Sequence, residues 1–346
     1  MREGERGCRA LISRHFASPV AVRSSQGIAD LIETGALERM PGVLYLASSC
    51  SPSRHPLPRI LVTLAVEGMC SAAAHPQGAE ALLACGGVAA VSHAMKSADP
   101  LRERGIIECG STAMGNMVSH YAVNSDLNAR ATDAVISADG HLRLLTVCPD
   151  GRATETAALA SVRALHNMCA GNIKGQRNTV MAGGVEALLE RLKHTYRQGM
   201  RRKGETAAHD CEMKEAVLSA LRNALVDHPD AQVLLFTLNG LPILLQVLTG
   251  TWGLSHAQHY CSHLAQHDIK SETRLGLFAK PTSYTTSGRE SYILGAAACV
   301  RLMLAGASKA HHALLQCGGL HVLLWLFLEG ASVAVQVSFD ALVGLF

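Results

Sequence analysis

Apolar residues recur every three or four positions over residues 155–170, a stretch that contains neither glycine nor proline. This period predicts a long amphipathic helix. After a break, residues 176–181 predict a short helix, and the pair Gly183 and Gly184 predicts a sharp turn that glycine takes easily. Residues 185–192 then predict a helix of medium length. The unit is therefore a long helix, a short helix, a glycine turn and a medium helix.

The same order of elements returns along the chain. In three copies the second residue of the turn follows a fixed position by 17 residues: Asn167 to Gly184, Asn223 to Gly240, and Leu302, in place of the Asn, to Gly319. Such agreement indicates an internal repeat. Further helices are predicted over residues 60–74, 76–84, 88–95, 106–118, 129–138, 141–147, 214–226, 232–238, 241–248 and 292–304. Before the helix at 232–238, Asp227 is predicted to be the cap and Pro229 to lie in the first turn.

The repeat register predicts one elongated domain over residues 1–346, because stacked repeats share a continuous core. The expected segments are a partial repeat over 1–50, repeats over about 57–250 and 291–330, a loop over 193–205, a flexible polar insertion over 251–290 and a partial repeat over 331–346. The composition agrees with close helix packing, since 48% of residues are apolar and only 4% aromatic.

These residues resemble the armadillo repeat family, whose units of about 42 residues carry the run A-L-x-N-L, a short helix and then G-G-[IV]-x-x-L-[LV]-x-L. The run is found at 164–168 with 183–192, at 220–224 with 239–248, and at 113–117 with 139–145. The resemblance implies an all-α fold, an armadillo-like right-handed α-solenoid that forms a superhelix of three-helix repeats. It does not select a member of the family.

The resemblance also implies a concave groove in which the Asn of each repeat binds the backbone of an extended peptide. The matching residues are Asn116, Asn167 and Asn223, and a carboxamide can both donate to and accept from an extended strand. The alternative is that each Asn bonds only a neighbouring helix. Other groove positions, four residues away on the same helical face, are Thr112, His120, Arg163, Ser219 and Asp227.

The expected function is a non-catalytic scaffold or adaptor that binds a protein or an extended peptide segment. One alternative is a regulator of a folded partner such as a small GTPase or a heat-shock chaperone. A nuclear import adaptor is disfavoured, because such proteins place a Trp where this chain has Thr112, Arg163 and Ser219. Arg163 and Asp227 instead favour a partner of mixed or acidic charge.

Charge and motifs exclude several other functions. Lys and Arg number 31 against 28 acidic residues, a balance of +3 that does not favour nucleic acid as a partner. The sequence contains no glycine-rich phosphate loop, no H-E-x-x-H pair and no G-x-S-x-G elbow, so we expect neither an enzyme nor a cofactor. A stripe of His256, His259, His263 and His267 suits zinc by spacing, but we interpret the segment as a polar insertion, because no carboxylate or second cysteine completes a tetrahedral set.

The remaining expectations concern location and assembly. Single, dispersed cysteines at apolar helix positions indicate a reducing compartment, so the cytoplasm is expected, with the nucleus as the alternative. A secretory signal is not expected, and the uncharged residues 310–328 fit the repeat better than a membrane span. The basic cluster Arg197, Arg201, Arg202 and Lys203 is interpreted as solvated. The apolar residues 342–346 suggest an end-to-end homodimer through the last helix, or a chain that is part of a longer protein.

Overall fold

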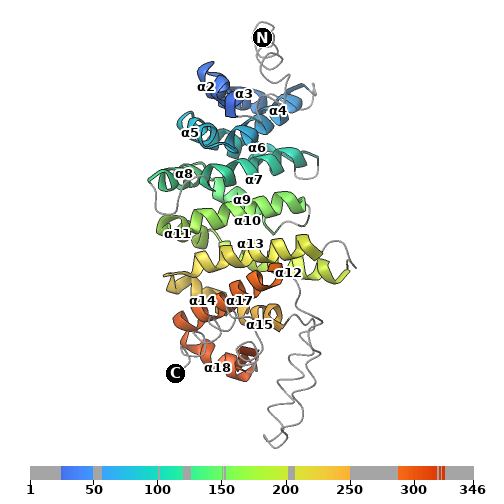
Figure 1. Ribbon diagram of the computed structural model, residues 1–346, viewed down its shortest axis with the longest axis vertical. Coiled ribbons are helices and arrows are strands. Elements are labelled where there is room, and N and C mark those ends of the chain that lie inside the picture. Colours follow the sequence, from blue (N-terminus) through green and yellow to red (C-terminus); the bar gives the residue numbers. More distant parts are fainter. Residues whose placement is uncertain are drawn as a thin grey trace, which may run out of the picture. The chain divides into compact units, whose positions relative to one another are not determined.

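The structure is a computed structural model that describes residues 25–49, 57–99, 102–119, 126–149, 151, 153–201, 207–249, 287–317, 319–320 and 322–323. Every regular element within these ranges is an α-helix (Figure 1). The chain divides into two compact units, Met1–Ala187 and Leu188–Phe346. The single domain predicted over residues 1–346 therefore stays a prediction.

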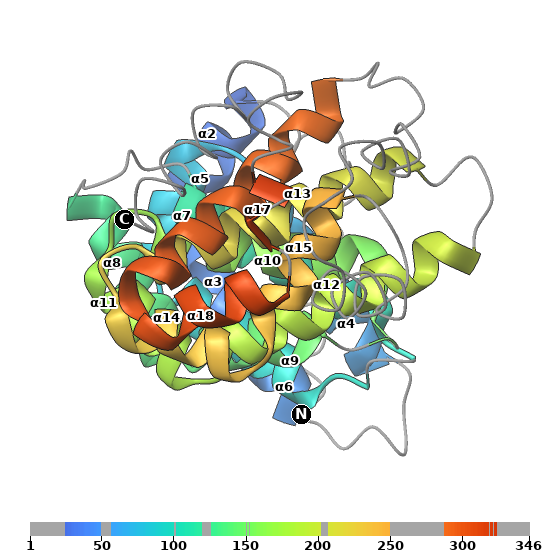
Figure 2. The ribbon, with the colours of Figure 1, turned by 90° about the horizontal axis from the view of Figure 1, so that it is seen from below.

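The helices of the first unit form three rows. They are α2 (Ser25–Glu33), α3 (Ala36–Ser49), α4 (Leu57–Ala73), α5 (Pro76–Ala84), α6 (Gly87–Ser97), α7 (Arg104–Ser119), α8 (Asp126–Ser137), α9 (Gly140–Val147), α10 (Glu155–Cys169) and α11 (Ile173–Met181). The long helices α4, α7 and α10 pack in sequence, as do the medium helices α3, α6 and α9. Figure 2 shows the short helices α5, α8 and α11 together on one side. The predicted order of long, short and medium helices is confirmed.

The second unit follows the same order. Helix α12 (Gly184–Arg201) begins at the end of the first unit and continues into the second. It is followed by α13 (Ala207–Leu225), α14 (Pro229–Thr237), α15 (Gly240–Thr249), α17 (Ser287–Gly306) and α18 (Ser308–Gln316). The long helix α17 packs on α13, α14 and α15, and α18 packs on α17.

Small and unbranched apolar side chains fill the core. Met69, Met114, Met117 and Met168 are each 0% exposed and lie among buried alanines, leucines and valines. Methionine has three rotatable bonds and fills irregular gaps between closely packed helices. This packing explains how the chain forms a core with so few aromatic residues.

The predicted turns are present, and their two residues have different roles. The first residue is in the left-handed region: Gly86 at φ 78°, Asp139 at 55°, Gly183 at 86° and Asn239 at 58°. In these four turns the second residue is a glycine that touches the preceding helix, whereas the turn before α3 has Gly35 at φ 65° followed by Ala36. A Cβ at Gly184 would lie 2.6 Å from the carbonyl oxygen of Thr179, and one at Gly240 would lie 2.7 Å from that of Leu235. These four turns therefore require glycine only at the second position.

Several predicted boundaries are wrong. The loop expected over 193–205 is helical as far as Arg201, because Leu192, Thr195 and Tyr196 continue the buried face of α12. Residues 287–290, assigned to the insertion, begin α17, and α13 begins at Ala207 rather than at 214. The rest of the predicted insertion and the residues 331–346 lie outside the described residues.

The predicted cap of α14 is also wrong. His228 is the N-terminal cap, and its ring Nδ1 accepts a hydrogen bond from the backbone N–H of Ala231 at 3.3 Å. Asp227 instead has a φ of 52°, in the left-handed region. Pro229 occupies the first turn as predicted, where its missing N–H removes no helical hydrogen bond.

Candidate partner-binding site

The long helices α7 and α10 lie side by side in the first unit and are joined at two points. The buried hydroxyls of Ser111 and Ser161 are 3.0 Å apart. A Cβ at Gly115 would lie 3.5 Å from the Cβ of Ala164, so small residues allow the helices to approach closely. The two helices form a well-packed support for any side chain that faces away from their contact.

The start of α10 is tied to α7. The hydroxyl of Thr154 accepts a hydrogen bond from the backbone N–H of Ala157 at 3.1 Å, which makes Thr154 the N-terminal cap. The same hydroxyl donates to Oε2 of Glu108 at 3.2 Å. The register between the two helices is therefore fixed by side chains at their beginning as well as by packing along their length.

Four of the predicted site residues lie on these helices. Thr112 and Asn116 are one turn apart on α7, and Arg163 and Asn167 are one turn apart on α10. Thr112, Asn116 and Asn167 are half-buried and Arg163 is exposed. We call these four residues the polar strip. It is bordered by apolar side chains that are 0% exposed, which are Ala113, Met114, Met117, Ala164, Leu165 and Met168.

The two asparagines of the polar strip keep their hydrogen-bonding groups available. Within the described ranges, neither the Asn116 nor the Asn167 side chain has a hydrogen-bond partner. Thr112 is different, because its hydroxyl donates to the carbonyl oxygen of Glu108 at 2.9 Å. The alternative in which Asn116 and Asn167 only bond a neighbouring helix thus has no support from the described contacts.

The remaining predicted residues are not brought into the polar strip. Ser219 and Asn223 are half-buried on α13 in the second unit, and Asp227 is exposed beyond its end. His120 lies outside the described residues. The ladder of three asparagines therefore stays a prediction.

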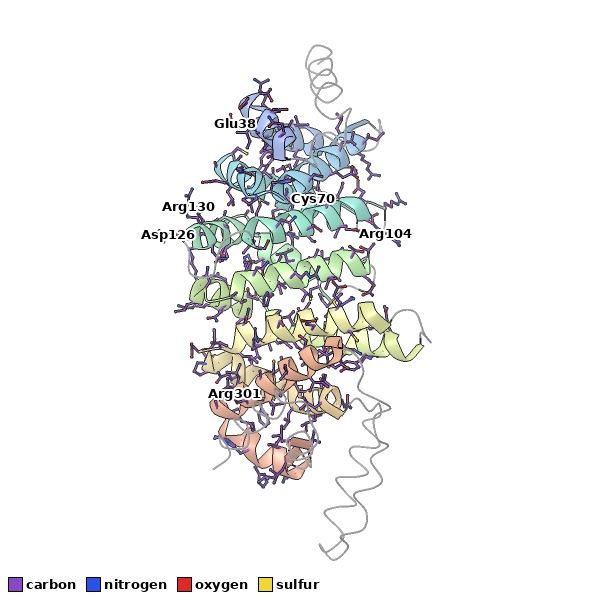
Figure 3. All side chains as sticks on the ribbon, viewed as in Figure 1. Glu38, Cys70, Arg104, Asp126, Arg130 and Arg301 are labelled. Atoms are coloured by element: carbon purple, nitrogen blue, oxygen red, sulfur yellow. The ribbon has the colours of Figure 1, made fainter. Side chains whose placement is uncertain are left out.

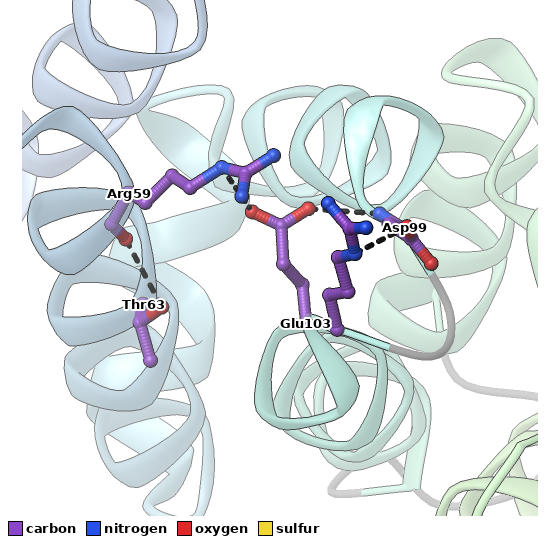
Figure 4. A network of polar contacts seen from close by, with 5 residues as sticks. Arg59, Thr63, Asp99 and Glu103 are labelled. Carbon is purple, nitrogen blue, oxygen red and sulfur yellow. Dashed lines mark hydrogen bonds and ion pairs between the residues drawn. The ribbon is translucent and has the colours of Figure 1, made fainter. Parts of the chain in front are cut away.

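Charged groups of both signs lie near the two ends of α7. Arg104 is exposed at the start of α7, and Asp126 and Arg130 are exposed on α8 near its other end (Figure 3). On α4, Nε of Arg59 lies 3.2 Å from Oε1 of Glu103 (Figure 4). The other carboxylate oxygen of Glu103, Oε2, accepts a hydrogen bond from the backbone N–H of Asp99 at 2.8 Å. This network joins α4 to the segment that precedes α7.

Sequence reasoning did not relate two cysteines that lie on neighbouring helices. Cys70 on α4 and Cys109 on α7 are both half-buried free thiols, and the presence of each shifts the pKa of the other, upward for Cys70 and downward for Cys109. Cys70 was interpreted only as an apolar helix residue. The two positions are not equivalent in the repeat register, so no spacing signal joins them before the helices are stacked.

The described residues bear on the predictions about metal binding and membrane spans only in part. Among the residues that the structure describes, no group of three or more His, Cys, Asp or Glu side chains could hold a metal ion. The predicted histidine stripe at 256–267 lies outside those residues.

Taken singly, none of the described helices has both the length and the apolar character to cross a bilayer. Two helix pairs, Pro76–Ala84 with Gly87–Ser97 and Pro229–Thr237 with Gly240–Leu248, meet the criterion together but are bent by 82° and 84°.

Comparison with solved structures identifies the fold as an α-helical repeat fold. A designed armadillo repeat protein is 17% identical, covers 90% of this chain and 100% of its own, and gives a TM-score of 0.59. Computationally designed armadillo repeat proteins for modular peptide recognition are 16% identical, cover 89% of this chain and 99% of their own, and give a TM-score of 0.60. A designed armadillo repeat protein in complex with the peptide (KR)4 is 16% identical, covers 90% of this chain and 99% of its own, and gives a TM-score of 0.57.

The chain has an armadillo-like repeat fold, and the predicted all-α solenoid class is confirmed. The sequence matches no protein-family model and no curated protein.

Proposed function

We propose that this chain is a non-catalytic scaffold or adaptor that binds an extended segment of a partner protein across the polar strip. The observation that carries the proposal is the pair of half-buried carboxamides, Asn116 and Asn167, whose hydrogen-bonding groups are unused within the described residues. They occupy the same repeat position on two helices that pack together. Asn223 is the proposed third member.

A carboxamide suits this task because an extended strand presents both N–H and C=O groups. One Asn side chain donates from its NH₂ and accepts at its oxygen, so it satisfies a donor and an acceptor of the peptide backbone. Backbone recognition gives affinity, and neighbouring side chains then select the sequence. The fixed register between α7 and α10 holds the two carboxamides in place before binding, which reduces the entropy lost on association.

The charges favour a partner segment of mixed or acidic character. Arg163 is exposed one turn from Asn167, and Arg104 is exposed at the start of α7. A basic peptide would meet these guanidinium groups with like charge. The designed relative in complex with (KR)4 binds a basic peptide, so we expect this chain to differ from it in preference. We place the protein in the cytoplasm, with the nucleus as the alternative.

Peptides selected from a random-sequence display library against the intact chain provide the test. Binding of the selected synthetic peptides is measured with the intact chain and with the triple variant Asn116→Ala, Asn167→Ala and Asn223→Ala. A matched control is Asn178→Ala, because Asn178 is half-buried on α11 and donates to the carbonyl oxygen of Lys174 at 2.9 Å. Circular dichroism confirms equal helicity.

Loss of binding only in the triple variant supports the proposal. Equal binding by the triple variant and the control overturns it. The alternative, a folded partner such as a small GTPase or a chaperone, would then be sought through the loops and the segment 251–290.

A further inference from the structure

The second unit has two exposed arginines on neighbouring long helices. Arg222 lies on α13, and Arg301 lies on α17, where Figure 3 labels it. The two hold the same repeat position, because each directly precedes the residue at the Asn position, which is Asn223 on α13 and Leu302 on α17. We call Arg222 and Arg301 the arginine pair.

Two contacts fix how α13 and α17 lie against each other. The hydroxyl of Ser291 donates a hydrogen bond to Oε1 of Glu215 at 2.6 Å. Further along, a Cβ at Gly295 would lie 2.9 Å from the Cβ of Leu218. Because these contacts follow one another in the same order on both helices, α13 and α17 run in the same direction.

This register places the arginine pair at nearly the same height. Arg222 comes four residues after Leu218 and Arg301 six residues after Gly295, which is a rise of about 6 Å and about 9 Å beyond their contact. Cys299, two residues before Arg301, gives a second indication. Burial raises the pKa of its thiol to about 12, and the Arg222 guanidinium opposes that rise, as expected of a cation close to α17.

Little negative charge compensates the arginine pair. Between Glu290 and Glu329 the sequence has no acidic residue, so α17 beyond its first turn and all of α18 contribute only positive charge. Asp227 is the acidic residue closest in sequence to Arg222, and within the described ranges neither arginine forms an ion pair. Two uncompensated guanidinium groups at one height repel each other, and a bound anion relieves this repulsion.

Acidic side chains elsewhere on α13 restrict the kind of anion. Glu212 and Glu215 are exposed two to three turns before Arg222. A nucleic acid carries a negative charge on every phosphate, so it would meet these carboxylates as well as the arginines. A protein segment can carry acidic side chains only where the arginines lie. The charge pattern therefore favours a protein segment.

We propose that the arginine pair binds two carboxylate side chains of an acidic segment in the partner protein. The inference rests on the proposed function, because Arg222 directly precedes Asn223, the proposed third backbone contact. A guanidinium presents parallel N–H donors that match the two oxygens of a carboxylate. Packed helices lie about 8–10 Å apart and an extended chain advances about 3.3 Å per residue, so the two acidic residues are about three residues apart.

Selection from two display libraries tests the required charge. One random-sequence library contains all residue types, and the other lacks Asp and Glu. Against the intact chain, we expect binders only from the complete library, with acidic residues about three positions apart. Equal binders from the acid-free library would overturn this inference. If those binders still lost affinity in the triple Asn variant, the proposed function would stand without it, whereas an empty complete library would overturn both.

Variants then test whether the arginine pair makes the contact. We expect Arg222→Gln and Arg301→Gln each to raise the Kd of a selected acidic peptide about two- to five-fold, with a smaller effect at high salt. The matched control is Lys309→Gln, which removes one exposed positive charge from α18 in the same unit and should leave the Kd unchanged. Equal effects of all three would indicate net charge alone and overturn the proposal.

A charge exchange shows whether the pairing is direct. Arg301→Glu should weaken binding of the acidic peptide, and replacing one acidic residue of the peptide by Lys should restore it. If no Lys-substituted peptide regains affinity for Arg301→Glu, the direct pairing is wrong. A single-stranded oligonucleotide that displaces the peptide and loses affinity in the same two arginine variants would assign the pair to nucleic acid and overturn the proposal.

Discussion

The turn between α11 and α12 allows a strict test of the repeat, through the substitution Gly184→Ala. An added Cβ would lie 2.6 Å from the carbonyl oxygen of Thr179 and 2.5 Å from its Cγ2. Thr179 is 0% exposed, so neither atom has free space in which to move. Because real Cβ atoms do not approach backbone this closely, α11 and α12 must separate. Overpacking of this kind destabilises proteins by about 1–3 kcal/mol.

Two control substitutions separate the effect of this contact from other effects of glycine. Gly42→Ala makes the same chemical change on α3, where an added Cβ meets no atom within 4 Å, so helix propensity should raise stability by up to about 1 kcal/mol. Gly183→Asn changes the first turn residue at φ 86°, and Asn239 already holds the equivalent position at φ 58°. Because Asn tolerates this region, we expect a change within about 0.5 kcal/mol.

Urea unfolding followed by far-ultraviolet circular dichroism measures the three variants against the intact chain. We expect the midpoint to fall for Gly184→Ala, to stay nearly constant for Gly183→Asn and to rise for Gly42→Ala. A midpoint for Gly184→Ala equal to that of Gly183→Asn would refute the reasoning, because it would show that the close approach of α11 and α12 is not needed.

Three further predictions concern the first unit. Thr154→Ala should lower the free energy of unfolding by about 1 kcal/mol, because the cap of α10 is lost, and urea unfolding checks it. Ser161→Ala should lower it by about 1–3 kcal/mol by stranding the buried Ser111 hydroxyl, and adding Ser111→Ala should recover part of the loss in the same assay. Burial lowers the pKa of His141 below its usual 6.5. The unfolded chain then binds more protons, so stability falls as the pH drops from about 6.5 toward the lower pKa of the folded state, and unfolding of His141→Gln should show a weaker dependence in that window.

The order of elements could be predicted from the sequence because it depends on local signals. Helical periodicity located the helices, and the glycine turns fixed the register that joins them. Helix ends were less predictable, since α12 extends past residue 193 only because Tyr196 becomes buried when the helices stack. The cap at His228 was missed because Asp and Pro signals stood on either side of it, and His is an uncommon cap.

The candidate site was partly predictable for the same reason. Asn116 and Asn167 share a repeat position, so the register placed them on equivalent helices, and their unused hydrogen-bonding groups were found only in the structure. The pair of Cys70 and Cys109 has no such signal. Its geometry depends on how α4 and α7 cross, which follows from tertiary packing rather than from spacing along the chain.

The spacing of the polar strip also limits the length of the segment that it can bind. Packed helices lie about 8–10 Å apart, and an extended chain advances about 3.3 Å per residue. The backbone groups held by Asn116 and Asn167 are therefore about three residues apart. On the α4 side of the strip the equivalent position is Gly68, which has no side chain and is buried, so it offers no side-chain polar contact.

Truncation of a selected peptide tests this spacing. Each Asn should contribute about 0.5–1.5 kcal/mol, a factor of about 2–10 in affinity. Shortening the peptide from one end should make binding insensitive to Asn116→Ala while Asn167→Ala still weakens it, and shortening from the other end should reverse the two. Affinities from isothermal titration calorimetry decide the matter. If both substitutions lose their effect at the same length and from either end, the two asparagines do not hold separate points along one extended segment.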